Sequence, residues 1–292
     1  MLALALLLIA PTVGDVDMFL TPASQCALVN EIVELDLFLA TNTAASLSAI
    51  DVILEWDPAE FEFQQALSAD IPWFAMGFFN DPDNINVDLQ DGDALFTALA
   101  NPGSPPSLPP ALIAVKFRFR VLSAGAIAIL PSLGSAETKV VGTVPGQDLT
   151  GVIPPPIFIG VTAPVMAAEV VRLGTPPNPD ALRPGLTTGP ILGERWDPFV
   201  DHTTFYPSSL LDIYTVYLDP ANQGSIFGPT LGANPIKTFY RSPLKTLKIN
   251  VPDDCTLVGV GIVLQAASWD GTPFTATSLQ FTNALDITIG TF

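Results

Sequence analysis

His202 is the only histidine of this 292-residue chain, so hydrolytic chemistry of the serine type would have to be built on it. Its neighbours are Asp201 and Thr203, and a Ser-His-Asp mechanism would use the ring as the base for Ser208 or Ser209. No Gly-x-Ser-x-Gly nucleophile motif occurs in the chain. The run Asp-His-Thr-Thr is typical of a turn that hydrogen-bonds its own backbone, and we favour that interpretation. One histidine and two distant cysteines also make a poor zinc site.

A second group that could take part in catalysis is the set of carboxylates Asp57, Glu60 and Glu62. A glycosidase needs two carboxyl groups on either side of a sugar-binding cleft. Here, however, Glu60 and Glu62 alternate with Phe61 and Phe63, which is the pattern of a strand with one wet face. We therefore interpret Asp57 as a turn-forming residue at the end of a strand and the two glutamates as solvent-facing residues.

The densest acidic cluster is the segment 81–93, DPDNINVDLQDGD. Calcium prefers six to eight oxygen ligands, so the segment is a candidate calcium site and Ca²⁺ is the one candidate cofactor. The candidate ligands are Asp81, Asp83, Asn86, Asp88, Asp91 and Asp93. An EF-hand register starting at Asn84 fails, because Leu89 stands where glycine is needed and Leu95 where the bidentate glutamate is needed. A solvated loop between strands is the favoured alternative.

Three basic residues, Lys116, Arg118 and Arg120, alternate along ALIAVKFRFRV and so fall on one face of a predicted strand. In a chain with a net charge of −18, this row could dock on an acidic patch of a neighbouring copy, such as the 81–93 loop. The alternative is an ordinary strand face that its charges protect against aggregation.

The segment 71–80, IPWFAMGFFN, carries the aromatic side chains Trp73, Phe74, Phe78 and Phe79. Exposed aromatic rings stack on sugars or enter a groove of a partner protein, so these four residues are candidate interface residues. The favoured alternative is that the loop caps a hydrophobic core.

The elements that would position these residues are short strands. The chain has 29 Pro and 21 Gly set between apolar runs rich in Val, Ile, Phe and Thr, and it contains no clear amphipathic helix. Residues 47–56 alternate cleanly, with Ile50, Val52, Leu54 and Trp56 on one face. We predict an all-β fold of two consecutive β-sandwich, jelly-roll-like domains at 15–160 and 161–292. The expected strands are 17–21, 32–39, 47–56, 60–66, 94–100, 111–121, 126–130, 138–144 and 156–162, then 210–218, 246–251, 257–265 and 285–289.

Residues 17–161 resemble the cohesin-like domains of bacterial secreted proteins. The resemblance is carried by VDMFL, LVNEIVELDLFLA, LSAIDVILEWDPAEFEF with its Trp-Asp-Pro, ALFTALA, ALIAVKFRFRV and PIFIGV. It implies a sandwich of about nine strands, of jelly-roll type. Members of that family in cellulose-degrading complexes bind dockerins, but no residue here allows that role to be carried over. Residues 161–292, which end in TNALDITIGTF, resemble the C-terminal domain that often follows such modules.

The N-terminal segment 1–14, MLALALLLIAPTVG, is interpreted as a secretory signal core or as a retained apolar segment. If it is retained, Leu2, Leu4, Leu6 and Leu8 share one strand face, as a donor strand inserted into a neighbouring copy would require. Nine apolar residues are too few to cross a bilayer, so no transmembrane span is expected. Cys26 and Cys255 either form one bridge, between domains or between chains, or remain as two buried thiols.

Charge and hydropathy narrow the function. Residues 15–160 hold 18 Asp and Glu against 4 Lys and Arg, a net of −14, so the chain repels phosphate backbones and nucleic-acid binding is not expected. The mean hydropathy of +0.44 is high for a soluble monomer, which indicates apolar surface buried between chains. We predict a secreted or cell-surface structural or adhesive protein, not an enzyme, that assembles with other copies of itself into a polymer or filament. The alternative is a secreted, non-catalytic module that binds carbohydrate or another surface protein.

Overall fold

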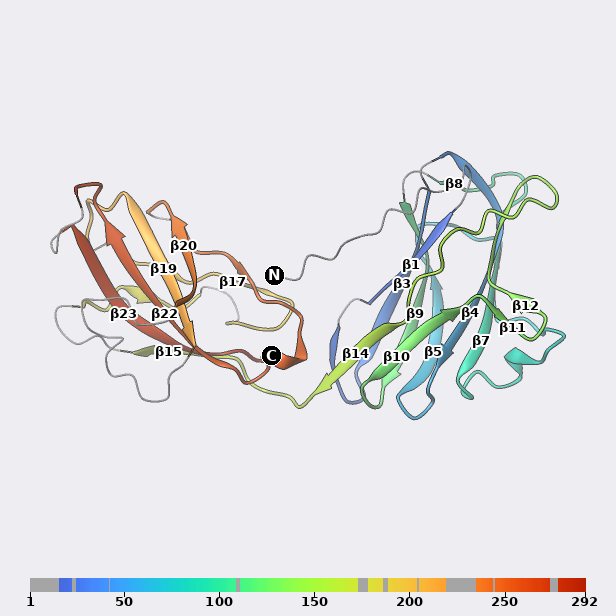
Figure 1. Cartoon of the computed structure of the whole chain (residues 1–292), viewed down its shortest axis with the longest axis horizontal. Helices are drawn as coiled ribbons and strands as arrows, with labels where there is room; N and C mark the ends of the chain where they lie inside the picture. The colour runs from blue at the N-terminus through green and yellow to red at the C-terminus, as the bar shows by residue number, and fades with distance from the viewer. Residues whose placement is uncertain are drawn as a thin grey trace. The chain divides into compact units, whose positions relative to one another are not determined.

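The structure is a computed structural model that describes residues 16–22, 25–41, 43–108, 111–172, 178–185, 189–203, 205–218, 235–243, 245–273 and 278–292. The chain divides into two compact units, residues 1–161 and 162–292 (Figure 1). Strands make up nearly all of the regular structure, and the helical segments within the described ranges are two short 3₁₀ turns. The predicted all-β fold is therefore confirmed. Among the described residues, no helix is long and apolar enough to cross a membrane.

The first unit is a sandwich of two sheets. The smaller sheet has the order β1-β3-β9-β5, with β1 at Asp17–Pro22, β3 at Ile32–Ala40, β9 at Ala111–Val121 and β5 at Phe61–Ser68. The larger sheet has the order β2-β14-β10-β4-β7-β6, with β2 at Cys26–Leu28, β14 at Ile157–Thr162, β10 at Gly125–Leu130, β4 at Ala45–Trp56, β7 at Asp93–Leu99 and β6 at Ala75–Gly77. Strands β13 (Lys139–Gly142) and β8 (Ser107–Leu108) also pair with β4. A small hairpin, β11 (Ser132–Leu133) and β12 (Ala136–Glu137), and the 3₁₀ turn η1 (Ile85–Val87) complete the unit.

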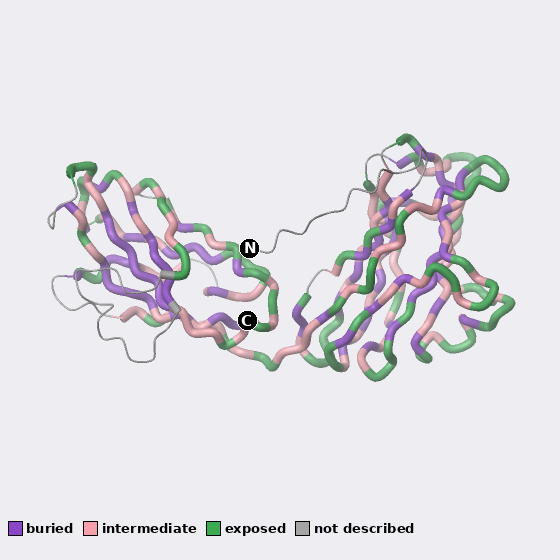
Figure 2. The backbone as a smooth tube through the Cα atoms, viewed as in Figure 1, coloured by how far each residue is buried: buried purple, intermediate pink, exposed green. Residues whose placement is uncertain are grey.

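The core of this unit lies between the two sheets, and along the strands buried residues alternate with partly buried and exposed ones (Figure 2). The alternation predicted for β4 is confirmed, because Ile50, Val52, Leu54 and Trp56 are all buried in it. The Trp56 ring meets Phe119 of β9 edge to face at 5.2 Å between ring centroids. Aromatic pairs of this geometry add about 0.5–1.5 kcal/mol to the free energy gained from burial. The sandwich is thus held together by contacts that cross from one sheet to the other.

The second unit is built on a five-stranded antiparallel sheet of order β15-β23-β22-β19-β20. Its strands are β15 at Ala168–Arg172, β23 at Leu279–Thr288, β22 at Gly261–Trp269, β19 at Leu211–Leu218 and β20 at Pro235–Arg241. Two short pairs accompany it, β16 (Leu182–Arg183) with β18 (Phe199–Val200), and β17 (Arg195–Trp196) with β21 (Ile249–Asn250). Trp196, Tyr214, Leu264 and Leu285 are among the buried residues that form its core.

A buried amide ties one of these short segments to the sheet. The side-chain oxygen of Asn283 accepts hydrogen bonds from the backbone N–H groups of Ala181 (2.9 Å) and Leu182 (2.7 Å), and its amide donates to the Leu182 carbonyl (3.0 Å). The Asn283 side chain therefore makes with the backbone of Ala181 and Leu182 the hydrogen bonds that a neighbouring strand would otherwise make.

The predicted strands of the second half need correction. The segment 257–265 was expected to be one strand, but β22 starts at Gly261 because Cys255–Leu257 forms the 3₁₀ turn η2, which Asp254 caps by accepting from Thr256 N. The strand expected at 246–251 is limited to Ile249–Asn250. Strands β15 and β20 were not predicted.

Candidate functional site

The first unit carries an open apolar groove of about 550 Å³ at one end of the larger sheet. It is lined by Ser48, Ala49, Phe74, Leu99, Ala100, Pro102, Pro105 and Thr143. Phe74 is 72% exposed and Leu99 is 41% exposed, although both are large apolar side chains. Exposed apolar residues grouped in a concave site are typical of a binding surface.

Local hydrogen bonds explain why Phe74 stays in this exposed position. Trp73 is half-buried against the core and its indole N–H donates to the Ala114 carbonyl at 2.9 Å. The Phe74 N–H donates to the Leu99 carbonyl at 2.8 Å, which extends the pairing of β6 with β7 by one residue. With its neighbour anchored on the core side, Phe74 is directed to the outside.

The four aromatic residues predicted as an interface therefore separate into two groups. Phe78 packs on the core beside Phe63 and Phe96, at 5.0 and 5.6 Å between ring centroids. The capping alternative thus describes Trp73 and Phe78, whereas Phe74 and Phe79 are exposed. Of the four, Phe74 lines the groove.

The predicted basic row lies on one face of β9, as expected, but acidic residues of the same sheet face it. Lys116 Nζ lies 2.6 Å from a Glu34 oxygen, and Arg118 Nε lies 3.0 Å from the other oxygen of Glu34. Arg120 pairs with Glu62 at 2.8 Å. Hydrogen bonds from Lys116 and Arg118 hold the pKa of Glu34 below its usual range. The geometry fits the alternative of a charged strand face, and docking of this row on another copy stays a prediction.

The carboxylates suggested for glycosidase chemistry are separately engaged. Asp57 accepts a hydrogen bond from the Ala59 N–H at 2.8 Å, which closes the turn after β4. Glu60 accepts from the Ala126 N–H at 3.3 Å. Glu62 pairs with Arg120, so each of the three carboxylates has its own partner within the sandwich.

The acidic loop 81–93 uses its polar side chains to hold its own backbone. Asp81 accepts hydrogen bonds from the N–H groups of Asp83, Ile85 and Asn86, at 2.9–3.0 Å. Asn86 bridges the Phe79 and Leu95 carbonyls and accepts from Leu95 N at 2.9 Å.

Asp83 joins this loop to the β11–β12 hairpin. Its carboxylate accepts from both the N–H and the hydroxyl of Ser135, each at 2.6 Å, and these bonds lower its pKa. No group of three or more acidic, histidine or cysteine side chains in the described ranges is arranged to hold a metal ion. The hydrogen bonds fit the alternative of a self-supporting loop, and a calcium site that includes Asp88, Asp91 and Asp93 stays a prediction.

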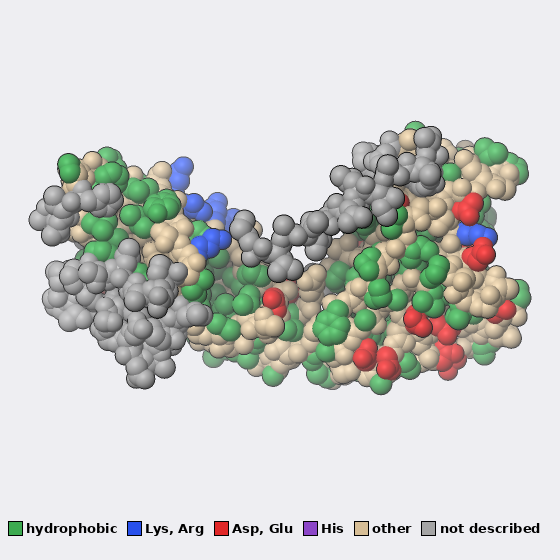
Figure 3. Space-filling view, viewed as in Figure 1, with side chains coloured by type: hydrophobic (Ala, Val, Ile, Leu, Met, Phe, Trp, Pro, Cys, Tyr) green, Lys and Arg blue, Asp and Glu red, His purple; other side chains and the backbone are tan. Residues whose placement is uncertain are grey.

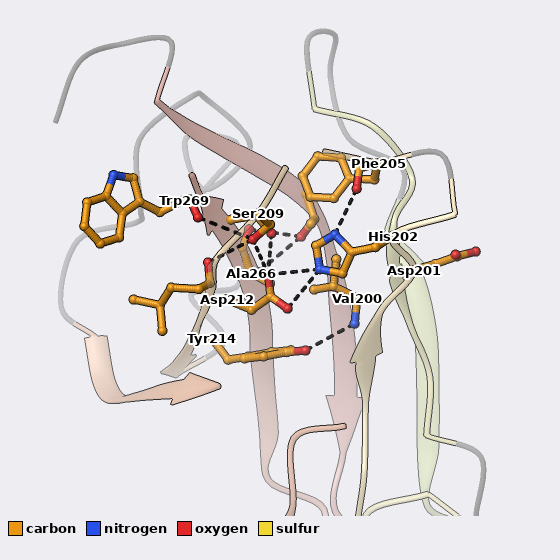
Figure 4. A network of polar contacts seen from close by, with 12 residues as sticks. Val200, Asp201, His202, Phe205, Ser209, Asp212, Tyr214, Ala266 and Trp269 are labelled. Atoms are coloured by element: carbon orange, nitrogen blue, oxygen red, sulfur yellow. Dashed lines mark hydrogen bonds and ion pairs between the residues drawn. The ribbon is translucent and has the colours of Figure 1, made fainter. Parts of the chain in front are cut away.

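The histidine lies in the second unit at the centre of a buried polar network (Figure 4). His202 Nε2 lies 2.9 and 3.0 Å from the two oxygens of Asp212, and Nδ1 lies 2.9 Å from the Phe205 carbonyl. The side chains of His202 and Asp212 are 5% and 1% exposed. One Asp212 oxygen also accepts hydrogen bonds from the hydroxyls of Ser209 (3.2 Å) and Ser268 (2.6 Å).

This geometry argues against His202 as a catalytic base. A carbonyl oxygen only accepts hydrogen bonds, so Nδ1 carries a proton. The other ring nitrogen, Nε2, is occupied by the Asp212 carboxylate, which also accepts from two hydroxyls. Both ring nitrogens are therefore engaged, and the Ser209 hydroxyl bonds to Asp212 and to the Leu211 carbonyl instead of to His202. The sequence did not identify Asp212 and Ser268 as members of this network, because the strand register that brings them together cannot be predicted from local spacing.

Two further predictions concern the cysteines and the N-terminus. Cys26 lies in β2 and Cys255 begins η2, and neither is a free thiol, so the free-thiol alternative is wrong. A bridge between domains or between chains stays a prediction. Leu2, Leu4, Leu6 and Leu8 lie outside the described residues, and the donor-strand interpretation is untested.

No family model matches this chain, and no curated protein matches it. Solved structures do. The seventh ScaB type I cohesin from Pseudobacteroides cellulosolvens is 14% identical, with a TM-score of 0.40 over 52% of this chain and 94% of that chain. A type II cohesin domain from the cellulosome of Acetivibrio cellulolyticus is 16% identical, with a TM-score of 0.36 over 50% and 94%. The cohesin module of a family 33 glycoside hydrolase from Clostridium perfringens is 8% identical, with a TM-score of 0.37 over 51% and 97%. The chain is thus similar to solved cohesin modules over about half of its length.

Proposed function

We propose that this chain is a non-catalytic extracellular protein-binding module that holds an apolar segment of another protein, flanked by basic residues, in the groove around Phe74. The single observation that carries the proposal is the 72% exposure of Phe74 at the rim of a groove of about 550 Å³. Burying one such side chain against a partner contributes about 1.5–3 kcal/mol to binding.

The chemistry of the groove favours protein over carbohydrate. Sugar sites need convergent polar groups beside the aromatic ring. The polar lining here is limited to Ser48 and Thr143, and the Ser48 hydroxyl already donates to the carbonyls of Val141 (3.2 Å) and Gly142 (2.7 Å). Basic flanks on the partner follow from the net charge of −14 over residues 15–160.

Three observations support the non-catalytic and extracellular parts of the proposal. Both ring nitrogens of the one histidine, His202, are engaged, by the Phe205 carbonyl and by Asp212, which argues against a role as general base. The absence of free cysteine thiols is typical of a protein that matures in an oxidising compartment. The apolar N-terminal segment 1–14 agrees with export.

The test uses a fluorescent probe peptide with Phe and Leu at its centre and Lys at both ends, titrated by anisotropy. We expect Phe74→Ser to weaken binding about tenfold or more, since a buried phenyl ring contributes at least 1.4 kcal/mol. The matched control is Phe79→Ser, which removes an exposed phenylalanine outside the lining of the groove. Equal binding by wild type and Phe74→Ser, or equal binding of the same peptide with Glu in place of Lys, would refute the proposal.

A second candidate function is self-assembly into a surface polymer. The observation that favours it is the segregation of charge between the two halves, −14 over residues 15–160 against −4 over 161–292, which carries 11 acidic and 7 basic residues. Sedimentation velocity at several protein concentrations tests it, and a species whose size is independent of concentration would exclude it.

A further inference from the structure

The second unit carries four cations that no described carboxylate neutralises. Seven of the 11 Lys and Arg residues lie within 4.0 Å of an Asp or Glu oxygen. The other four follow one another on β20 and the segment after it, and we call them the basic strip. They are Lys237, Arg241, Lys245 and Lys248.

The chain segment that carries the basic strip has no acidic residue of its own, and the buried Asp212 of β19 lies opposite Arg241 in the strand register. No Asp or Glu occurs anywhere in residues 220–252 of the sequence. Lys237 lies over the Phe239 ring at 5.1 Å, and Arg241 donates to the neighbouring Tyr240 carbonyl at 3.0 Å. Figure 3 shows Lys and Arg side chains gathered on this face of the second unit. In a chain of net charge −18, an unpaired group of this kind marks a surface for an acidic partner.

Apolar surface adjoins the basic strip. Ile236 and Tyr240 on β20 are 53% and 60% exposed. Ile236, Lys237 and Phe239 also line an apolar pocket of about 260 Å³ with Trp196 and Val251 of the core. The segment that follows β20 is fixed, because Leu247 is buried and its N–H donates to the Pro198 carbonyl at 2.9 Å. The surface thus combines charge with apolar contact area, as interfaces between proteins do.

The first unit offers the complementary surface. Glu55 of β4 and Asp93 of β7 are directly opposite in the strand register, and Asp91 lies beside them in the loop that precedes β7. Like charges placed opposite one another in a sheet are destabilising. Burial, followed by the charges of Asp91, Glu55 and Asp81, raises the pKa of Asp93. We call Glu55, Asp91 and Asp93 the acidic rim, and no described Lys or Arg lies within 4.0 Å of it.

We propose that the basic strip of one copy docks on the acidic rim of the first unit of a second copy. The contact joins two different surfaces, so it leaves one free surface at each end and extends head to tail. The inference rests on self-assembly, the second candidate function, and names the residues through which assembly occurs. In this proposal the basic strip takes the docking role that was predicted for Lys116, Arg118 and Arg120 of β9, because those three residues are already paired within their own sheet.

The test is sedimentation velocity of the full chain in chelator-containing buffer. The strip variant carries Lys237→Gln, Arg241→Gln, Lys245→Gln and Lys248→Gln. The rim variant carries Glu55→Gln, Asp91→Asn and Asp93→Asn. We expect each variant to self-associate about tenfold more weakly than wild type, as the loss of several exposed ion pairs implies. Raising the salt from about 0.05 M to about 0.5 M should weaken wild-type association in the same way.

Mixing the two variants separates lost docking from lost folding. The strip variant keeps an intact rim and the rim variant keeps an intact strip, so an equimolar mixture should form one-to-one pairs that grow no further. The charge-matched control neutralises the four cations of the first unit, Lys116, Arg118, Arg120 and Lys139, and should associate like wild type.

The outcomes distinguish the two proposals. Concentration-dependent assembly that the strip and rim variants leave unchanged would overturn this docking mode and leave self-assembly standing. A wild-type protein that associates neither with nor without chelator would overturn both. Loss of association in the charge-matched control alone would assign docking to the β9 row instead, and assembly that chelator abolishes would assign it to a bridging metal ion.

Discussion

Replacing Asp212 with alanine should destabilise the second unit far more than any exposed charge change. The carboxylate is 1% exposed and accepts three hydrogen bonds, from His202 and from the hydroxyls of Ser209 and Ser268. A buried donor left without its acceptor costs about 1–3 kcal/mol, so the loss of an acceptor that serves several buried donors should cost about 3–5 kcal/mol. For a unit of this size, that loss lowers the melting temperature by about 10 °C.

Asp212→Asn is the informative companion variant. The amide oxygen can still accept from the two serine hydroxyls, and the amide N–H would donate to His202 Nε2. We expect a smaller loss, about 1–2 kcal/mol, because most of the buried hydrogen bonds are retained.

The assay is urea unfolding combined with hydrogen exchange of peptides from β19 and β22, which locates the loss in the second unit. The control is Asp180→Ala, which breaks an exposed ion pair with Arg183 at 3.1 Å and should cost less than about 1 kcal/mol. If Asp212→Ala costs no more than this control, the buried pair does not exist in solution and the argument against His202 as a base fails. If Asp212→Asn costs as much as Asp212→Ala, the amide does not keep the hydrogen bonds of the carboxylate, and the network does not tolerate the isosteric side chain as argued.

Three further predictions concern the first unit. The pKa of Asp83 lies below its ordinary value of 3.8 because Ser135 donates hydrogen bonds to its carboxylate. The ionised carboxylate therefore stabilises the fold fully above that value, and this stabilisation is lost as the pH falls through the lower folded pKa. Hydrogen exchange of amides in the β11–β12 hairpin should become faster below about pH 4, and Ser135→Ala should make it faster at neutral pH. Gly92→Ala should cost more than about 1 kcal/mol in thermal melts, since φ is +112° and the new Cβ would lie 2.6 Å from a backbone oxygen; the control Gly146→Ala has a positive φ but open space, and equal losses would contradict the steric argument. Chelator should leave the melting temperature unchanged because the 81–93 loop is held by its own side chains, and a clear decrease would restore the calcium hypothesis.

The strands of the first unit could be predicted from the sequence because the alternation of apolar residues is visible within each segment. In β4, Ile50, Val52, Leu54 and Trp56 recur at every second position, and Pro58 follows close behind. The second unit was predicted less well, because β20 reads PIKTFYR, where Lys237 falls on the face that packs near the core. A lysine there breaks the apolar alternation that identifies a strand.

For the candidate sites, local spacing predicted the face that a residue occupies but not the residues that it contacts. The three cations of β9 were placed on one face correctly, since a two-residue period is sufficient for that. Their partners Glu34 and Glu62 belong to β3 and β5, and only the register of three strands brings them within reach. His202 and Asp212 are likewise 10 residues apart and meet through the return of β19. Local spacing predicts which face a residue occupies, whereas contacts between elements depend on tertiary pairing.

The buried amide of Asn283 has a consequence for how the protein ages. Asparagine deamidates when the N–H of the next residue attacks the side-chain carbonyl, which requires a backbone conformation far from that of an extended strand. Asn283 and Ala284 lie within β23, and Ala284 pairs with Arg172 of β15 and Gln265 of β22, so the attack is blocked while the sheet is intact. If it occurred, the new carboxylate would face the Leu182 carbonyl to which the amide now donates, and the segment would be repelled. The folded sheet therefore protects chemically the one side chain whose spontaneous conversion would open it.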